Sequence, residues 1–161
     1  MDIVRELEEW IDQLNLQNVG ERIPCSTLYE HFKGYHNREF LEKSFYISVD
    51  TIPKPDFEEL RAIGLGSFLD ERVEGITYKN TYYILNDKVN QFDLHFHELV
   101  HVVQWKLLGV NDFIKKYMEE AADYGNGPLE KMAFSMQDEF CEKSRVFPVE
   151  TEVAYKLGLP T

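Results

Sequence analysis

Three of the chain's five histidines fall within residues 94–108, LHFHELVHVVQWKLL. Positions i and i+4 of a helix lie on the same face, so His97 and His101 are spaced to bind one zinc ion with nitrogen bonds of about 2.0–2.1 Å. Glu98 lies about 100° further round the helix, where it is placed to accept a proton from a water molecule bound to the metal. This H-E-x-x-H arrangement indicates a zinc metallopeptidase whose general base is Glu98.

The residues around this motif are almost all apolar, which predicts that the helix lies in the core. Burying two histidines and a glutamate without partners would cost several kcal/mol, and a bound metal accounts for them. His95 precedes His97 by two residues and therefore points about 200° away, so we interpret it as a surface histidine or one on a second helix face. His31 and His36 lack ligand spacing, and we do not expect them to bind metal.

A catalytic zinc typically has three protein ligands and a water molecule. The best candidate for the third ligand is Glu130, which follows His101 by 29 residues (130 − 101) and lies in the first turn of a helix predicted after Gly127-Pro128. Three further carboxylates remain alternatives, although they are more typical of a solvent-exposed acidic helix face: Glu119, Glu120 and Asp123.

Three functions are compatible with these residues. The first is a peptidase, in which Tyr117 or Tyr124 is a candidate donor to the transition-state oxyanion. The second is a zinc hydrolase that acts on a non-peptide amide. The third is a non-catalytic binding or structural protein, whose zinc would be closed by a fourth protein ligand. Cys25 and Cys141 are isolated in sequence, so we expect free thiols and no cysteine-based zinc motif.

The segment HELVH at 97–101, followed by a helix bearing Glu130, resembles the gluzincin branch of the zinc metallopeptidases. The longer pattern of HELVHVVQ with a later PLEKMA is similar to small, mostly bacterial zincin-like domains, as is GITYKNTYYIL at 75–85. The resemblance covers about residues 75–140. It implies zinc held by His97, His101 and Glu130, with Glu98 as base, and a strand within 75–85 that forms a cleft wall to which an extended peptide can add.

The sequence departs from the thermolysin-like pattern at one position. Where that pattern has an aspartate one turn after the glutamate ligand, this chain has Phe134. Hydrogen-bonding support for the ligands must then come from elsewhere, for example from Gln104, Asp123 or a backbone carbonyl.

Hydrophobic periodicity and turn residues predict an α+β single domain spanning 1–161. The resemblance implies that this domain is zincin-like, with its motif-bearing core at about 75–140. We expect a small mixed or antiparallel sheet packed on the histidine helix, and a mainly helical second half. Predicted helices cover 2–16, 26–31, 40–43, 56–63, 90–108, 111–122, 128–143 and 150–157; predicted strands cover 45–50 and 75–85, with Asn80 in a turn and a loop at 64–67.

The composition limits the partners. The net charge of −12 disfavours binding to nucleic acids, whose phosphates would be repelled. No segment approaches 18 consecutive apolar residues, and the acidic N-terminus lacks the pattern of a secretory signal, so we expect a cytoplasmic protein that does not bind membranes. The expected partner is a peptide or protein substrate, and the expected cofactor is one zinc ion.

Overall fold

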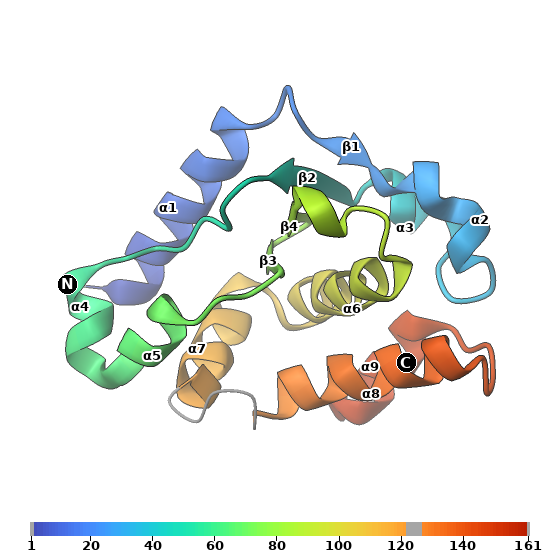
Figure 1. Cartoon of the computed structure of the whole chain (residues 1–161). Coiled ribbons are helices and arrows are strands. Elements are labelled where there is room, and N and C mark those ends of the chain that lie inside the picture. Colours follow the sequence, from blue (N-terminus) through green and yellow to red (C-terminus); the bar gives the residue numbers. More distant parts are fainter. Residues whose placement is uncertain (1, 122–126, 161) are drawn as a thin grey trace.

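The computed structural model describes residues 2–121 and 127–160. Its first half contains α1 (Ile3–Gln17), β1 (Ile23–Pro24), η1 (Cys25–Leu28), α2 (Tyr29–Phe32), α3 (Arg38–Glu42), β2 (Phe45–Val49), α4 (Glu58–Leu60), η2 (Arg61–Leu65), α5 (Gly66–Asp70), β3 (Gly75–Tyr78) and β4 (Thr81–Leu85). The second half contains η3 (Asn86–Lys88), α6 (Phe92–Leu108), α7 (Val110–Ala121), α8 (Pro128–Glu142) and α9 (Val149–Lys156). The predicted α+β class and the helical second half are confirmed (Figure 1).

The sheet has the strand order β1-β2-β4-β3. The neighbours β2 and β4 run parallel, while β1 with β2 and β3 with β4 are antiparallel, so the sheet is mixed. A two-residue turn joins β3 to β4, and Lys79 in this turn has a φ of 62°. The side chain of Lys79 forms ion pairs with Glu8 and Asp12, which attach α1 to the turn.

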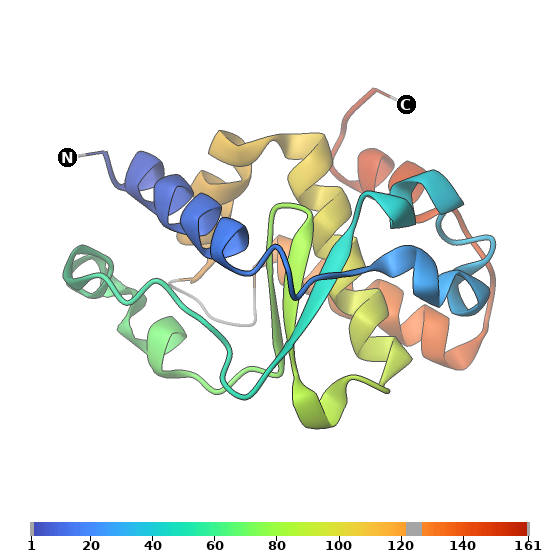
Figure 2. The ribbon, with the colours of Figure 1, turned by 90° about the horizontal axis from the view of Figure 1, so that it is seen from above.

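Helices cover both faces of the sheet, and this explains why every residue of β4 is buried. Successive side chains of a strand point to opposite faces. Tyr82 and Ile84 therefore join the core around α6, whereas Tyr83 joins a second core with Leu7 and Ile11 of α1. Viewed from above, α1 and α6 lie on opposite sides of the strands (Figure 2). Helix α8 packs beside α6 in both views (Figures 1 and 2).

The segment 56–70 differs from its prediction. The expected loop at 64–67 is helical, because Gly64 adopts a φ of 99° that lets the chain kink and begin α5 at Gly66. Asp56 does not cap α4 as predicted, because this helix begins after Phe57 and has no side-chain cap. Its carboxylate instead binds Arg61 at 2.7 Å, and Arg61 also binds Asp70 at 2.8 Å, so this ion-pair cluster spans the kink.

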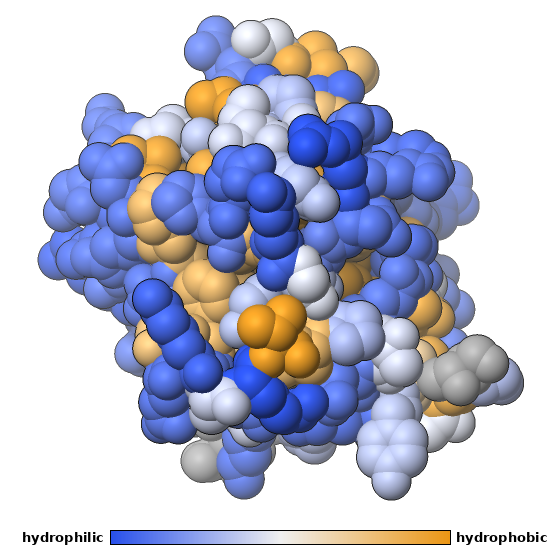
Figure 3. Space-filling model, turned by 90° about the vertical axis from the view of Figure 1, so that its right-hand side faces the viewer, coloured by the Kyte–Doolittle hydropathy of each residue, from blue (hydrophilic) through white to orange (hydrophobic). Residues whose placement is uncertain are grey.

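The surface shown in Figure 3 is mainly hydrophilic, and its hydrophobic residues form small separated groups. None of the described helices is both long enough and apolar enough to cross a membrane. Cys25 is buried and Cys141 is exposed, and both are free thiols, as predicted.

Candidate metal centre

Helix α6 carries the H-E-x-x-H residues, and it is buried on all sides from His95 to Trp105. Its end is marked by Gly109, which has a φ of 83° that favours glycine. One helical turn separates His97 from His101, and their ring centroids lie 4.9 Å apart. The helix therefore presents both imidazoles on one side, as predicted from their spacing.

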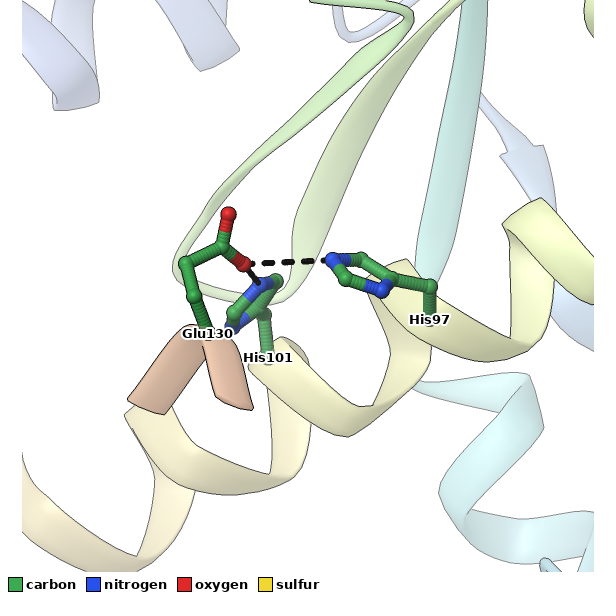
Figure 4. A group of neighbouring side chains, drawn as sticks. All are labelled: His97, His101 and Glu130. Carbon is green, nitrogen blue, oxygen red and sulfur yellow. Dashed lines mark hydrogen bonds and ion pairs between the residues drawn. The ribbon is translucent and has the colours of Figure 1, made fainter. Parts of the chain in front are cut away.

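Glu130 lies in the first turn of α8 and reaches across to both histidines (Figure 4). Its Oε1 atom is 3.2 Å from Nε2 of His97 and 2.5 Å from Nε2 of His101. Each of the three residues offers a ligand atom, and these atoms lie within 4.8 Å of one another. The structure thus brings the three predicted ligands together.

Two glutamines orient the histidine rings. Gln104 donates its amide N–H to the carbonyl of Leu129 at 3.1 Å, so its oxygen is left to accept from Nδ1 of His101 at 2.7 Å. Gln137 donates to Asp93 at 3.2 Å, so its oxygen accepts from Nδ1 of His97 at 2.9 Å.

This hydrogen bonding has a consequence for the proton positions. When Nδ1 of each neutral ring carries the proton, Nε2 presents a lone pair. The lone pairs of His97 and His101 then converge with a carboxylate oxygen of Glu130. Such a set of acceptors must be bridged by protons or by a cation.

The spacing of the cluster fits a divalent ion. Two ligands of a tetrahedral zinc lie about 3.3 Å apart when the metal–ligand bonds are about 2.0–2.1 Å. The separation of 3.2 Å between Nε2 of His97 and Oε1 of Glu130 matches this value, whereas the separation of 2.5 Å between Nε2 of His101 and Oε1 of Glu130 is shorter. The donor set of two imidazoles and one carboxylate is also typical of catalytic zinc sites.

The three groups of the cluster shift one another's pKa values. Burial opposes protonation of His101, but the Glu130 carboxylate outweighs burial and raises the pKa of His101 to about 9. Burial also acts on Glu130, yet the two histidines hold the pKa of its carboxyl group well below the ordinary value. Protons and a metal ion would therefore compete for the same nitrogen atoms.

Glu98 points towards the sheet and is almost completely buried. The hydroxyl group of Thr77 donates to its Oε1 at 2.9 Å. A Cβ atom on Gly75 would lie only 3.2 Å from the Glu98 carboxyl group, so glycine at this position gives the carboxylate room. Burial raises the pKa of Glu98, and the neighbouring histidines oppose the shift.

Of the alternative acidic ligands, the two that the structure describes, Glu119 and Glu120, do not join the cluster. Glu119 is exposed, and Asp123 lies outside the described residues. Glu120 instead accepts a hydrogen bond from the backbone N–H of Leu129 at 2.8 Å, which ties the end of α7 to the first turn of α8. A Cβ atom on Gly127 would overlap the side chain of Glu120, so this close approach requires glycine.

Three further residues named from the sequence are the candidate oxyanion donors Tyr117 and Tyr124, and Phe134. Tyr117 lines the cavity next to the cluster and packs against Phe68 and Phe113, so its role as an oxyanion donor stays a prediction. Tyr124 lies outside the described residues. Phe134 does not hydrogen-bond a ligand; its ring packs 4.5 Å from the ring of His97.

His95 lies on a second helix face, as one of our two interpretations held, but it is fully buried and is not a surface residue. Its Nε2 donates to the carbonyl of Val89 at 2.8 Å, and its Nδ1 accepts from the hydroxyl group of Tyr82 at 2.6 Å. Partners within the core satisfy this histidine without a metal.

Sequence reasoning missed three contributors to the site: Thr77, Gly75 and Gln137. The first two lie on a strand that was predicted as a cleft wall, but no local pattern assigns them to Glu98. Gln137 follows Glu130 by seven residues, which is two helical turns, so this spacing was the one available signal. Gln104 was predicted as a supporting residue and does contact His101.

Comparison of the chain with known proteins finds no matching family model, curated protein or solved structure.

Proposed function

We propose that this protein is a zinc-dependent metallopeptidase with a zincin-like fold, which hydrolyses peptide bonds with Glu98 as the general base. The observation that carries the proposal is the convergence of three lone-pair donors, from His97, His101 and Glu130, on one point beside a buried carboxylate. Among the described residues, no fourth histidine, cysteine or acidic residue joins this group, which favours an open catalytic site over a closed structural one.

The arrangement of elements supports the zincin-like part of the proposal. The outer strand β3 lies against α6, which carries both histidines, and α8 supplies the carboxylate. Two contacts join β3 to α6 at the site: the hydroxyl group of Thr77 binds Glu98, and the indole N–H of Trp105 donates to the carbonyl of Thr77 at 3.2 Å. The strand and the histidine helix therefore form one rigid wall.

When bound, zinc supplies Lewis acidity, which lowers the pKa of a water molecule towards about 7 and polarises a carbonyl group. Glu98 accepts the proton of the attacking water and delivers it to the leaving amine. The hydrogen bond from Thr77 holds one carboxylate oxygen, which fixes the side chain for both transfers. The raised pKa of the buried Glu98 carboxyl group suits a residue that must gain and then lose a proton near neutral pH.

The register of β3 supports binding of an extended peptide at its edge. Hydrogen-bonded pairs alternate along an antiparallel ladder, and the N–H of Leu85 donates to the carbonyl of Glu74. Gly75 and Thr77 therefore direct their backbone groups away from β4. The carbonyl of Thr77 already accepts a hydrogen bond from Trp105. The backbone N–H and carbonyl of Gly75, beside Glu98, are therefore the groups with which a substrate strand would pair.

The proposal is tested by titrating the purified protein with zinc and by measuring cleavage of a peptide library. We expect one bound zinc per chain. Glu98→Gln should retain the zinc and lose catalysis by about 10²–10⁴-fold, since it removes a general base and preserves the shape of the side chain. Glu119→Gln is the matched control, because Glu119 is exposed on α7, and it should keep full activity.

Other outcomes would overturn the peptidase. A protein that binds zinc and cleaves nothing, before and after the substitution at Glu98, would have a structural site. Cleavage of non-peptide amides alone, lost in Glu98→Gln, would identify a different zinc hydrolase. Equal peptide cleavage by wild type and Glu98→Gln would remove Glu98 as the base.

A further inference from the structure

A cavity of about 380 Å³ opens beside the candidate metal centre and extends away from it. At one end it is lined by the three candidate ligands and by Glu98. Volumes of this size are typical of pockets that enclose small molecules or large side chains. The space is therefore much larger than a water molecule and a scissile carbonyl group require.

The walls of the cavity away from the metal centre are apolar. They come from the α4–α5 region, which precedes β3 in the chain, and from α7, which follows α6. These wall residues include Leu60, Leu65, Phe68, Phe113, Ile114 and Met118. All of these except Met118 are buried, and most of them belong to the same core that contains residues of α1. An apolar group entering from the metal centre would meet hydrocarbon on all of these surfaces.

Charged side chains line the cavity only near its edges, among the described residues. Arg72 and Glu74 are exposed, in the segment that leads into β3, and the remaining charges belong to the metal centre itself. A charged substrate side chain placed deep in the cavity would lose its water and find no oppositely charged partner among the described residues of that part of the wall. The lining therefore favours aliphatic and aromatic groups.

We propose that this cavity is the specificity pocket of the site, and that it receives a bulky aliphatic or aromatic side chain from a residue next to the hydrolysed peptide bond. The inference rests on the proposed peptidase function, because it assigns the substrate class of that same site. The continuity of the cavity with His97, Glu98 and His101 places such a side chain directly beside the reacting carbonyl group. The pocket is lined by residues of α1, the α4–α5 region, the β3 segment, α6, α7 and α8, so only the folded chain forms it.

Binding can be separated from catalysis with zinc-loaded Glu98→Gln. The probes are blocked tripeptides, acetyl-Gly-X-Gly-amide, with X as Phe, Leu, Ala or Lys, and affinity is measured by calorimetry. We expect Leu and Phe peptides to bind about 50-fold more tightly than the Ala peptide, because each buried CH₂ group contributes about 0.8 kcal/mol. The Lys peptide should bind no better than the Ala peptide.

Variants of the wall provide the second arm. Met118→Glu introduces a carboxylate at a half-buried wall position, and it should weaken the Phe peptide about tenfold or more while strengthening the Lys peptide. Lys115→Glu makes a larger change of charge on an exposed part of the same helix and should alter neither affinity. Leu65→Phe fills the cavity without a charge and should weaken the Phe peptide more than the Ala peptide.

The outcomes distinguish this inference from the proposed function. Equal affinity for all four peptides, no binding of any of them, or equal effects of Met118→Glu and Lys115→Glu would overturn the specificity pocket. If the Phe and Leu preference is found but wild type cleaves nothing, the pocket stands and the peptidase fails. If wild type cleaves peptides without regard to X, the peptidase stands and the pocket fails.

Discussion

Replacing Gln137 with leucine removes the acceptor that holds the Nδ1–H group of His97, and we expect this change to weaken zinc binding. In the structure the two groups lie 2.9 Å apart, and Asp93 fixes the glutamine in turn. Without this acceptor the His97 ring is free to rotate or to carry its proton on Nε2, which removes the lone pair that faces Glu130. Gln137 is half-buried, so leucine is tolerated sterically.

The size of the effect follows from the behaviour of similar contacts. Loss of a hydrogen bond to a metal-bound histidine lowers metal affinity by about 10–100-fold. At a free zinc concentration about 100 times the wild-type Kd, zinc stabilises the wild-type fold by about 2.7 kcal/mol, and this falls to about 0.4–1.4 kcal/mol in the variant. For a domain of this size the zinc-induced rise in Tm should fall from about 5–10 °C to about 1–6 °C.

Two measurements check this prediction: zinc titration in competition with a chromogenic chelator, and calorimetric melting with and without zinc. Ser135→Ala is the control, because Ser135 is exposed on the same helix and should leave zinc affinity unchanged. The reasoning is refuted if Gln137→Leu binds zinc as tightly as wild type, or if both variants lose affinity equally.

Two predictions concern the stability of the core. Tyr82→Phe leaves Nδ1 of the buried His95 without its donor and should lower the free energy of unfolding by about 1–3 kcal/mol in urea titrations, whereas the exposed Tyr155→Phe should be neutral. Burial lowers the pKa of His36 to about 3, below its unfolded value of about 6.5, so the native state binds fewer protons and stability should fall as the pH drops below about 6.5. The loss should reach about 1.4 kcal/mol per pH unit at pH 4–6 in the wild type, and the part due to His36 should be absent from His36→Phe; identical pH profiles for the two proteins would contradict this assignment.

Much of the fold could be predicted from local patterns. The histidine helix was predicted at 90–108 and runs from Phe92 to Leu108, and α8 begins at Pro128 as its turn residues indicated. Within the segment 56–70, the loop predicted at 64–67 is wrong, because this part of the chain is helical. The prediction relied on Gly64 and Gly66, which usually indicate a break in a helix. In the folded chain Arg61 binds the carboxylates of Asp56 and Asp70, and helical structure resumes within one residue of the kink.

The sequence by itself determined the placement of His97 and His101 on one helix face, with Glu98 beside them, because the period of the α-helix sets these directions without any tertiary contact. Only the tertiary structure decided that Glu130 reaches both rings, since that depends on how α8 packs against α6 and on the contact between Glu120 and the backbone of Leu129. It also decided the partners of Glu98 and the shape of the cavity. Residues from strands and helices far apart in the chain form these features, and no local periodicity encodes their distance in space.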